Sequence, residues 1–235
     1  MADEKKKVTI FTTAPFPLPP IAARAEIRTA RLLIRPPRLS DVAAYHELRS
    51  DEESMKWSAR GRADRNLDET RAALEAVQPP NDTSSYHFLV FDKETGELVG
   101  DGGVHPSSFW FGWPEIGYGI KREARGRGYA AEFLAAFLEN WWALPRTEVE
   151  MDVDPGTADP AGDGSVPEQL TAMVGVENIA SQKLVEKCGF RRFKEWEEVD
   201  GRAESATHGQ QARLLGYALP SPPANASTGE KTAQG

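Results

Sequence analysis

Residues 121–142, with the sequence KREARGRGYAAEFLAAFLENWW, join a basic, glycine-containing turn to a strong helical pattern. The turn holds two glycines, Gly126 and Gly128, among four cations: Lys121, Arg122, Arg125 and Arg127. Glycine allows successive backbone N–H groups to converge on one point. The N-terminus of a helix adds unpaired donors and the positive end of its dipole. The stretch therefore predicts a phosphate-binding loop.

The helix that follows carries apolar residues four positions apart in two neighbouring rows. These are Phe133, Phe137 and Trp141 in one row, and Leu134, Leu138 and Trp142 in the other. Rows at this spacing share one face of a helix, and a face this broad is buried in a globular protein. We therefore expect the phosphate loop to stand on a rigid core element.

Known phosphate loops differ in the residues around their glycines. A P-loop ends in Gly-Lys-Ser or Gly-Lys-Thr, and neither follows Gly128. A dinucleotide-binding loop is the closer rival, because Gly126, Gly128 and Ala131 satisfy G-x-G-x-x-A. Glu148 also follows at about the expected 20 residues. In that fold, however, the strand ends at the first glycine, whereas here the charged run KREAR separates Ile120 from Gly126.

A third pattern, R-x-x-G-x-A, is satisfied by Arg125, Gly128 and Ala130, and the predicted strand EIGYGI at 115–120 precedes it. This strand, loop and helix resemble motif A of the GCN5-related N-acetyltransferases, which hold the pyrophosphate of acetyl-CoA. The segment 177–193, ENIASQKLVEKCGFRRF, resembles their motif B, most closely in the RimJ/RimL-like branch. The matching residues are Asn178, Ser181, Glu186, Lys187, Gly189 and Phe190. The start at 29–48, TARLLIRPPRLSDVAAYHEL, is also similar to that branch, so the resemblance spans about 29–219.

Composition limits the class of protein. With 235 residues, 40% of them hydrophobic, the chain supports one ordinary core with length left for tails. A net charge of −8 argues against a general nucleic-acid or anionic-membrane binder, since either needs a basic face. The single cysteine, Cys188, excludes a disulfide framework and a multi-cysteine metal site. No segment is apolar enough to span a membrane, and we expect a cytoplasmic monomer or homodimer.

The chain divides into two tails and one domain. Residues 1–25 are charged and then proline-rich, and we expect a tail with one short extended stretch at 8–12. Residues 26–219 form the domain, and 220–235 are polar enough to be disordered. Between 145 and 168 the sequence is acidic and rich in glycine and proline, typical of a surface insertion, although 149–153 alternates like a strand. Further strands are expected at 30–35, 86–92, 97–104, 170–176, 190–196 and 214–219, and helices at 42–49, 67–77 and 179–187.

The resemblance implies an α/β fold with a mixed, mostly antiparallel sheet of six to seven strands, flanked by about four helices. In this family the pantetheine arm of acetyl-CoA lies where the sheet is splayed, here between 115–120 and 170–176. Strand amides can pair with those of pantetheine, and a helix N-terminus can hold the pyrophosphate. The implied cofactor residues are Tyr118, Gly119, Ile120, Arg125, Gly126, Arg127, Gly128, Tyr129, Ala130, Asn178 and Ser181. A structural role remains the alternative for Arg127, as a solvated cation, and for Asn178, as a helix cap.

Transfer of an acetyl group to an amine needs a base for the amine and an acid for the departing thiolate. Glu115 begins the cofactor strand and is the predicted base, acting through water, with His105 as the alternative. Ser181 is the predicted acid, because the resemblance places the sulfur near it; completing the helix cap is its alternative role. Many relatives carry a tyrosine acid four residues later, where this chain has Val185. Cys188 lies on the apolar row of its helix and is predicted to be core rather than a nucleophile.

The first functional hypothesis is an acetyl-CoA-dependent N-acetyltransferase, an acyltransferase that acts on a primary amine by direct transfer in a ternary complex. The acceptor is a protein N-terminus, as in the RimJ/RimL-like branch, or a small amine. An acidic surface favours a cationic acceptor. A non-catalytic acyl-CoA-binding module and an NAD(P)-binding oxidoreductase are the alternatives. The polar, arginine-rich segment 57–65 is expected to lie on the acceptor side.

Overall fold

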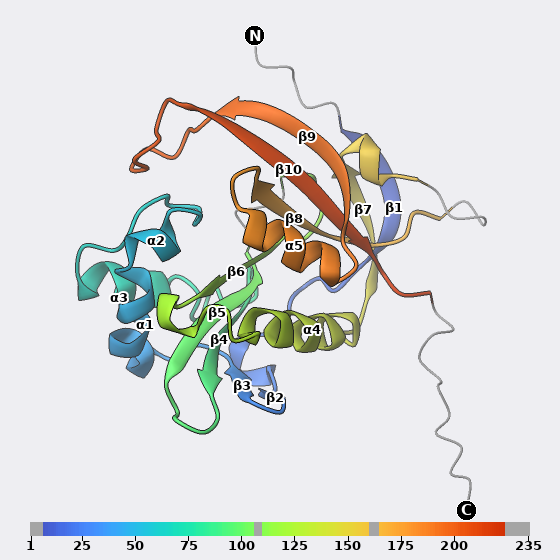
Figure 1. Ribbon diagram of the computed structural model, residues 1–235. Coiled ribbons are helices and arrows are strands. Elements are labelled where there is room, and N and C mark those ends of the chain that lie inside the picture. The colour runs from blue at the N-terminus through green and yellow to red at the C-terminus, as the bar shows by residue number, and fades with distance from the viewer. Residues whose placement is uncertain (1–6, 106–109, 160–164, 224–235) are drawn as a thin grey trace, which may run out of the picture.

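The computed structural model describes residues 7–105, 110–159 and 165–223. Within them, the protein folds into three sheets with helices packed around them (Figure 1). The strands are β1 (Val8–Ala14), β2 (Ile27–Arg28), β3 (Leu32–Arg35), β4 (Tyr86–Asp92), β5 (Leu98–Val104), β6 (Ile116–Ile120), β7 (Thr147–Val153), β8 (Gln169–Gly175), β9 (Arg191–Val199) and β10 (Gln211–Pro220). The α-helices are α1 (Val42–Arg49), α2 (Glu52–Met55), α3 (Leu67–Glu75), α4 (Tyr129–Trp142) and α5 (Ile179–Lys187). Short 3-10 turns lie at η1 (Ile21–Ala23), η2 (Leu39–Asp41), η4 (Arg122–Ala124) and η5 (Pro155–Thr157).

The larger sheet is antiparallel, in the order β2-β3-β4-β5-β6, and helices cover both of its faces. Its central strand β4 is buried along its whole length, which explains its apolar and aromatic sequence YHFLVFD. Phe88 and Val90 share a core cluster with the apolar face of α4, while Leu89 and Phe91 pack with α1 and α3. The face of α4 predicted from its apolar rows is therefore buried against the sheet.

A smaller sheet, ordered β8-β10-β9, adjoins the edge strand β6 of the larger one. The two sheets meet at a parallel bridge between Glu115 and Thr171. Within the described part of the chain, β6 and β8 form no ladder beyond that bridge, so the sheet opens between them toward the N-terminus of α4. Figure 1 shows α4 and α5 together on one side of this opening. The splayed, mixed α/β fold is the one that the resemblance predicts.

The N-terminal segment and the insertion pair with each other. The extended stretch expected at 8–12 is strand β1, and it runs antiparallel to β7 from the insertion, with Val8 opposite Val153 and Ala14 opposite Thr147. Ile10 and Val153 are buried in a cluster with aromatic residues from the segment that precedes β6. Both segments therefore contribute core residues, and the alternating stretch 149–153 expected within the surface insertion is part of β7.

At the base of the insertion, buried Glu168 accepts a hydrogen bond from Arg146 at 3.0 Å. This ion pair joins the residue before β7 to the residue before β8, and so closes the insertion into a loop. No helix among the described residues is long and apolar enough to cross a membrane.

Candidate active site

The turn before α4 has an open, left-handed backbone. Gly126 and Gly128 have φ values of 75° and 82°, which favour glycine, and both are exposed. A Cβ on Gly126 would meet nothing within 4 Å. The first hydrogen bond of the helix runs from Glu132 N–H to Gly128 C=O, so the amides of residues 129–131 have no acceptor within the helix. This arrangement suits an anion with several oxygens.

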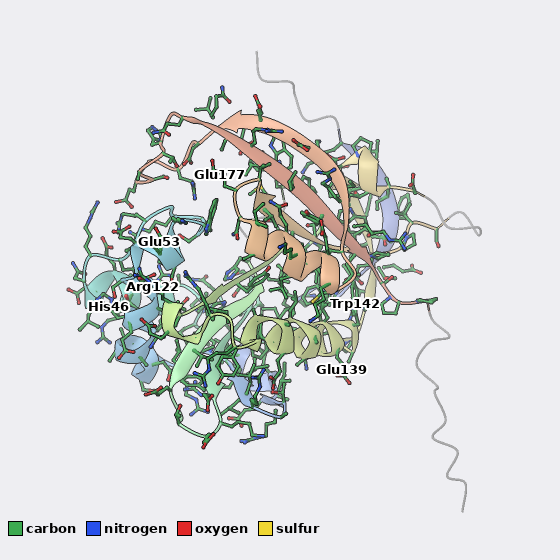
Figure 2. All side chains as sticks on the ribbon, in the orientation of Figure 1. His46, Glu53, Arg122, Glu139, Trp142 and Glu177 are labelled. Atoms are coloured by element: carbon green, nitrogen blue, oxygen red, sulfur yellow. The ribbon has the colours of Figure 1, made fainter. Side chains whose placement is uncertain are left out.

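The basic residues around this turn are engaged with neighbouring elements to different degrees. Lys121 pairs with Glu47, and Arg122 pairs with Asp51 at 2.6 Å, so both point toward α1 and α2 and away from the turn. Figure 2 shows Arg122 on the α2 side of the molecule, near Glu53, and far from Glu139 and Trp142 at the other end of α4. The positive charge at the turn is therefore smaller than the sequence suggests.

The two predicted cofactor cations, Arg125 and Arg127, remain close to the turn. Arg125 donates to Ile120 C=O at 3.1 Å and to Ser54 Oγ at 2.8 Å, which ties the loop to β6 and to α2. The guanidinium of Arg127 lies 4.8 Å from the ring of Tyr129. The guanidinium of Arg31, a residue that sequence reasoning missed, also lies 4.8 Å from this ring and donates to Arg127 C=O. Its signal in the sequence is the TARLLIR start of the resemblance.

Strand β6 carries backbone donors that point into the opening. Lys121 N–H donates to Val99 C=O, and two residues along the ladder Gly119 lies opposite Asp101. Because hydrogen-bonded pairs alternate in an antiparallel ladder, the backbone of Gly119 faces β5. The N–H groups of Tyr118 and Ile120 then face β8. Of the three predicted strand residues, Tyr118 and Ile120 can pair with a ligand in the opening through their backbone N–H groups. Gly119 has no side chain and leaves space beside the strand.

Helix α5 meets β6 across the opening. Asn178 Oδ1 accepts a hydrogen bond from Ser181 N–H at 3.2 Å, so its side chain caps the helix. Ser181 Oγ lies 2.7 Å from the hydroxyl of Tyr118, whose pKa is raised to about 12 by burial. Val185, where relatives have a tyrosine, is fully buried. Cys188 is half-buried, and burial raises the pKa of its thiol.

Glu115 differs from His105 in its environment. Glu115 is 7% exposed, its Oε2 has no hydrogen-bond partner, and burial raises the pKa of its carboxyl to about 8. Burial and the neighbouring His87 lower the pKa of His105 to about 4. A general base works best when its pKa is near the working pH, so these environments favour Glu115.

The structure also brings Tyr45 and Asp101 to this region, and sequence reasoning missed both. Tyr45 Oη donates to Asp101 Oδ2 at 2.6 Å, beside the backbone of β6. The available signal was an acidic residue within the apolar, glycine-rich strand LVGDGGV. A charged side chain in a sheet interior is rare without a partner or a function.

Comparison with known proteins identifies the family. The sequence model described as "Acetyltransferase (GNAT) domain" matches residues 31–191, which is more than half of the chain. The chain belongs to the GNAT acetyltransferase family. This membership confirms the predicted enzyme class, an acyltransferase, and with it acetyl-CoA as the cofactor.

Individual relatives of this GNAT protein are distant in sequence. An uncharacterized N-acetyltransferase, p20 of Bacillus licheniformis, is 25% identical over 185 residues, covering 74% of this chain and 88% of the relative. A GNAT-family acetyltransferase from Bacillus anthracis has a similar fold, with a TM-score of 0.61 at 22% identity over 84% of this chain and 99% of that one. Spermidine N-acetyltransferase from Vibrio cholerae, solved with CoA and spermine, gives a TM-score of 0.60 at 17% identity over 82% and 97% of the two chains.

Proposed function

We propose that this GNAT protein moves the acetyl group of acetyl-CoA to a primary amine by direct transfer in a ternary complex. The single observation that carries this proposal is the open turn at Gly126, where exposed glycines and unpaired helix amides leave room for a diphosphate. The residues present fit the cofactor. Backbone N–H groups of 126–130 and the side chain of Arg127 would hold the pyrophosphate, and the backbones of Tyr118 and Ile120 would hold the pantetheine arm.

Acetyl-CoA supplies the acetyl group as an activated thioester. The Tyr118 N–H, directed into the opening, donates to the oxygen on which negative charge develops. Glu115, ionised, takes the proton of the attacking amine through water. Ser181 Oγ–H returns a proton to the thiolate and is held in position by Tyr118 Oη at 2.7 Å. The Ser181 hydroxyl thereby takes the role that a tyrosine at position 185 plays in many relatives.

The acceptor is a primary amine, either a protein N-terminus, as in the RimJ/RimL-like branch, or a small cationic amine. A net charge of −8 supports a cationic acceptor. The fold shared with spermidine N-acetyltransferase supports the small-amine choice.

Two measurements test this function. Titration with acetyl-CoA and with NADH in parallel should raise the melting temperature with acetyl-CoA alone, since a ligand stabilises the state that binds it. Thiol release from acetyl-CoA should then depend on an added primary amine. Stabilisation by NADH alone would point to an oxidoreductase. Binding of acetyl-CoA with no amine-dependent thiol release, over a wide acceptor panel, would leave a non-catalytic acyl-CoA-binding module.

A further inference from the structure

One side of β6 has no side chains, and a polar network borders it. Gly117 and Gly119 alternate along the strand and so face the same side. A Cβ on Gly119 would lie 2.9 Å from Asp101 Oδ1, and one on Gly117 would lie 3.8 Å from His105 Cδ2. Asp101 and His105 therefore flank a strip of bare backbone, which we call the glycine strip.

Tyr45 of α1 orients the carboxylate of Asp101. Its hydroxyl donates to Asp101 Oδ2 at 2.6 Å, and the Tyr45 side chain is buried. The other oxygen, Oδ1, is the one that lies against Gly119. Because α1 packs on β5, this hydrogen bond directs one carboxylate oxygen toward the glycine strip.

The groups around this carboxylate stabilise its charge only in part. His87 Nε2 lies 3.6 Å from Oδ2, and the N–H of Gly119 donates to the carboxylate. His105 and Arg49 favour its charged form, but burial still raises the pKa of Asp101. Burial lowers the pKa of His87 to about 3 and that of His105 to about 4, so both imidazoles are neutral at pH 7. The guanidinium of Arg49 donates to both oxygens of Asp64, at 2.6 and 3.1 Å. A half-buried carboxylate in this setting gains from a cationic ligand.

We propose that Asp101 Oδ1 binds the ammonium group of the acceptor against the glycine strip. The inference rests on the proposed function and names its acceptor subsite. The ligand class is an unhindered primary amine, because two glycines span about 7 Å of strand and accommodate an aminomethylene group. Glu115 precedes Gly117 by two positions on the same side of the strand. Gly119, against which Oδ1 lies, is four positions and about 13 Å of strand from Glu115, so the proton passes from the bound amine to the base through more than one water.

Replacing Asp101 by asparagine removes the charge and keeps the shape. With 1-aminobutane, spermidine and a short peptide with a free N-terminus as acceptors, we expect the KM of each to rise about tenfold or more, by a similar factor. A similar factor is expected because Asp101 contacts the reacting nitrogen, which all three acceptors share. The kcat at saturating amine and the Kd of acetyl-CoA, measured by calorimetry, should change less than about threefold.

Glu139→Gln provides the matched control. It removes the same charge from an exposed position on α4 (Figure 2) and should leave all three KM values unchanged. Asp101→Glu keeps the charge and should retain part of the affinity for the amine acceptor. If the asparagine variant does not fold, the KM values of Asp101→Glu provide the test instead. Unchanged acceptor KM values in a folded variant, or a rise confined to spermidine, would overturn the inference. Wild-type protein that binds no acetyl-CoA would instead overturn the proposed function, and this subsite with it.

Discussion

At the scale of single residues, the burial of Glu115 is the feature of the site that costs stability in an ordinary fold. Its Oε2 is buried without a hydrogen-bond partner. A buried, unpaired polar oxygen carries a desolvation cost that apolar packing does not offset. A ligand in the opening between β6 and β8 would account for this cost, whereas Gly126 adopts its left-handed backbone without strain and leaves the turn open.

Glu115→Gln tests the base. Because burial raises the pKa of Glu115 to about 8, we expect the wild-type kcat to rise with pH through that value. The variant should lose this rise and turn over slowly, with its affinity for acetyl-CoA preserved. Turnover assays from pH 6 to 9 would measure the pH dependence of kcat, and calorimetry would measure the affinity for acetyl-CoA. A variant with the wild-type pH profile would exclude Glu115 as the base and return attention to His105.

The same group links stability to pH. A folded-state pKa of about 8, above the ordinary 4.5, means that the folded protein retains a proton that the unfolded chain releases. The corresponding stability is complete below about pH 4.5 and is lost as the pH rises to about 8. Glu115→Gln should therefore melt near the wild-type temperature at pH 4.5 and above it at pH 9. Equal melting temperatures at pH 9 would contradict the burial of an ionisable carboxyl there.

Gly126→Ala tests the turn, and Gly96→Ala is its matched control. Their φ values are 75° and 72°, and a Cβ on either would meet nothing within 4 Å. Each substitution should cost about 1 kcal/mol through left-handed strain. The added methyl at 126 should in addition weaken acetyl-CoA binding, whereas the hairpin variant should bind normally. Equal affinities in calorimetry would show that the turn does not contact the cofactor.

At the scale of elements, α4 and the β1–β7 ribbon position the site from two directions. The buried face of α4 fixes the turn at its N-terminus, while the ribbon packs on the segment that leads into β6. Trp113, two residues before Glu115, is fully buried and donates to Thr157 Oγ1 of η5 at 2.7 Å. The insertion therefore supports the residue predicted to be the base.

Neighbouring residues of β1 test how much the ribbon contributes. Ile10 is 8% exposed within the aromatic cluster, and Phe11 is 74% exposed on the outer face. Ile10→Ala should lower the free energy of unfolding by about 2–4 kcal/mol, because it leaves a cavity. Phe11→Ala should change it by less than about 0.5 kcal/mol. Urea denaturation measures both, and equal effects would mean that β1 is only loosely attached.

At the scale of the whole molecule, loops from distant parts of the chain meet beside α2. Arg202, in the β9–β10 loop, donates to Lys56 C=O and Ser58 C=O at 3.0 and 2.9 Å. Glu204 of the same loop pairs with Arg62 at 2.9 Å. Trp57 reaches β8, where a Cβ on Gly175 would lie 2.7 Å from its ring. The segment 57–65 therefore bridges α2 and the smaller sheet.

Arg202→Ala should loosen this bridge. We expect a several-fold increase in acceptor KM with an unchanged Kd for acetyl-CoA, because the bonds that are lost lie away from the turn. Arg192→Ala is the control, since it removes an exposed arginine paired with Glu195 on β9. It should change neither constant. A loss of acetyl-CoA affinity in Arg202→Ala would show that the bridge supports the cofactor side instead.

The sequence alone was sufficient for the elements whose patterns are local. The apolar rows of α4, the glycines of its turn and the likeness of motifs A and B depend on residues close together in the chain, so spacing was enough to predict them. The backbone of Gly126 and the capping role of Asn178 follow from the same local rules.

Only the tertiary structure could decide which distant groups meet. Lys121 and Arg122 belong to the basic cluster of the loop in sequence, but in the fold they pair with Glu47 of α1 and with Asp51, the N-cap of α2. The pairing of β1 with β7 and the contact of Tyr45 with Asp101 join residues far apart in sequence. Such contacts, and the pKa of Glu115 that burial sets, depend on packing in three dimensions, which periodicity along the chain does not encode.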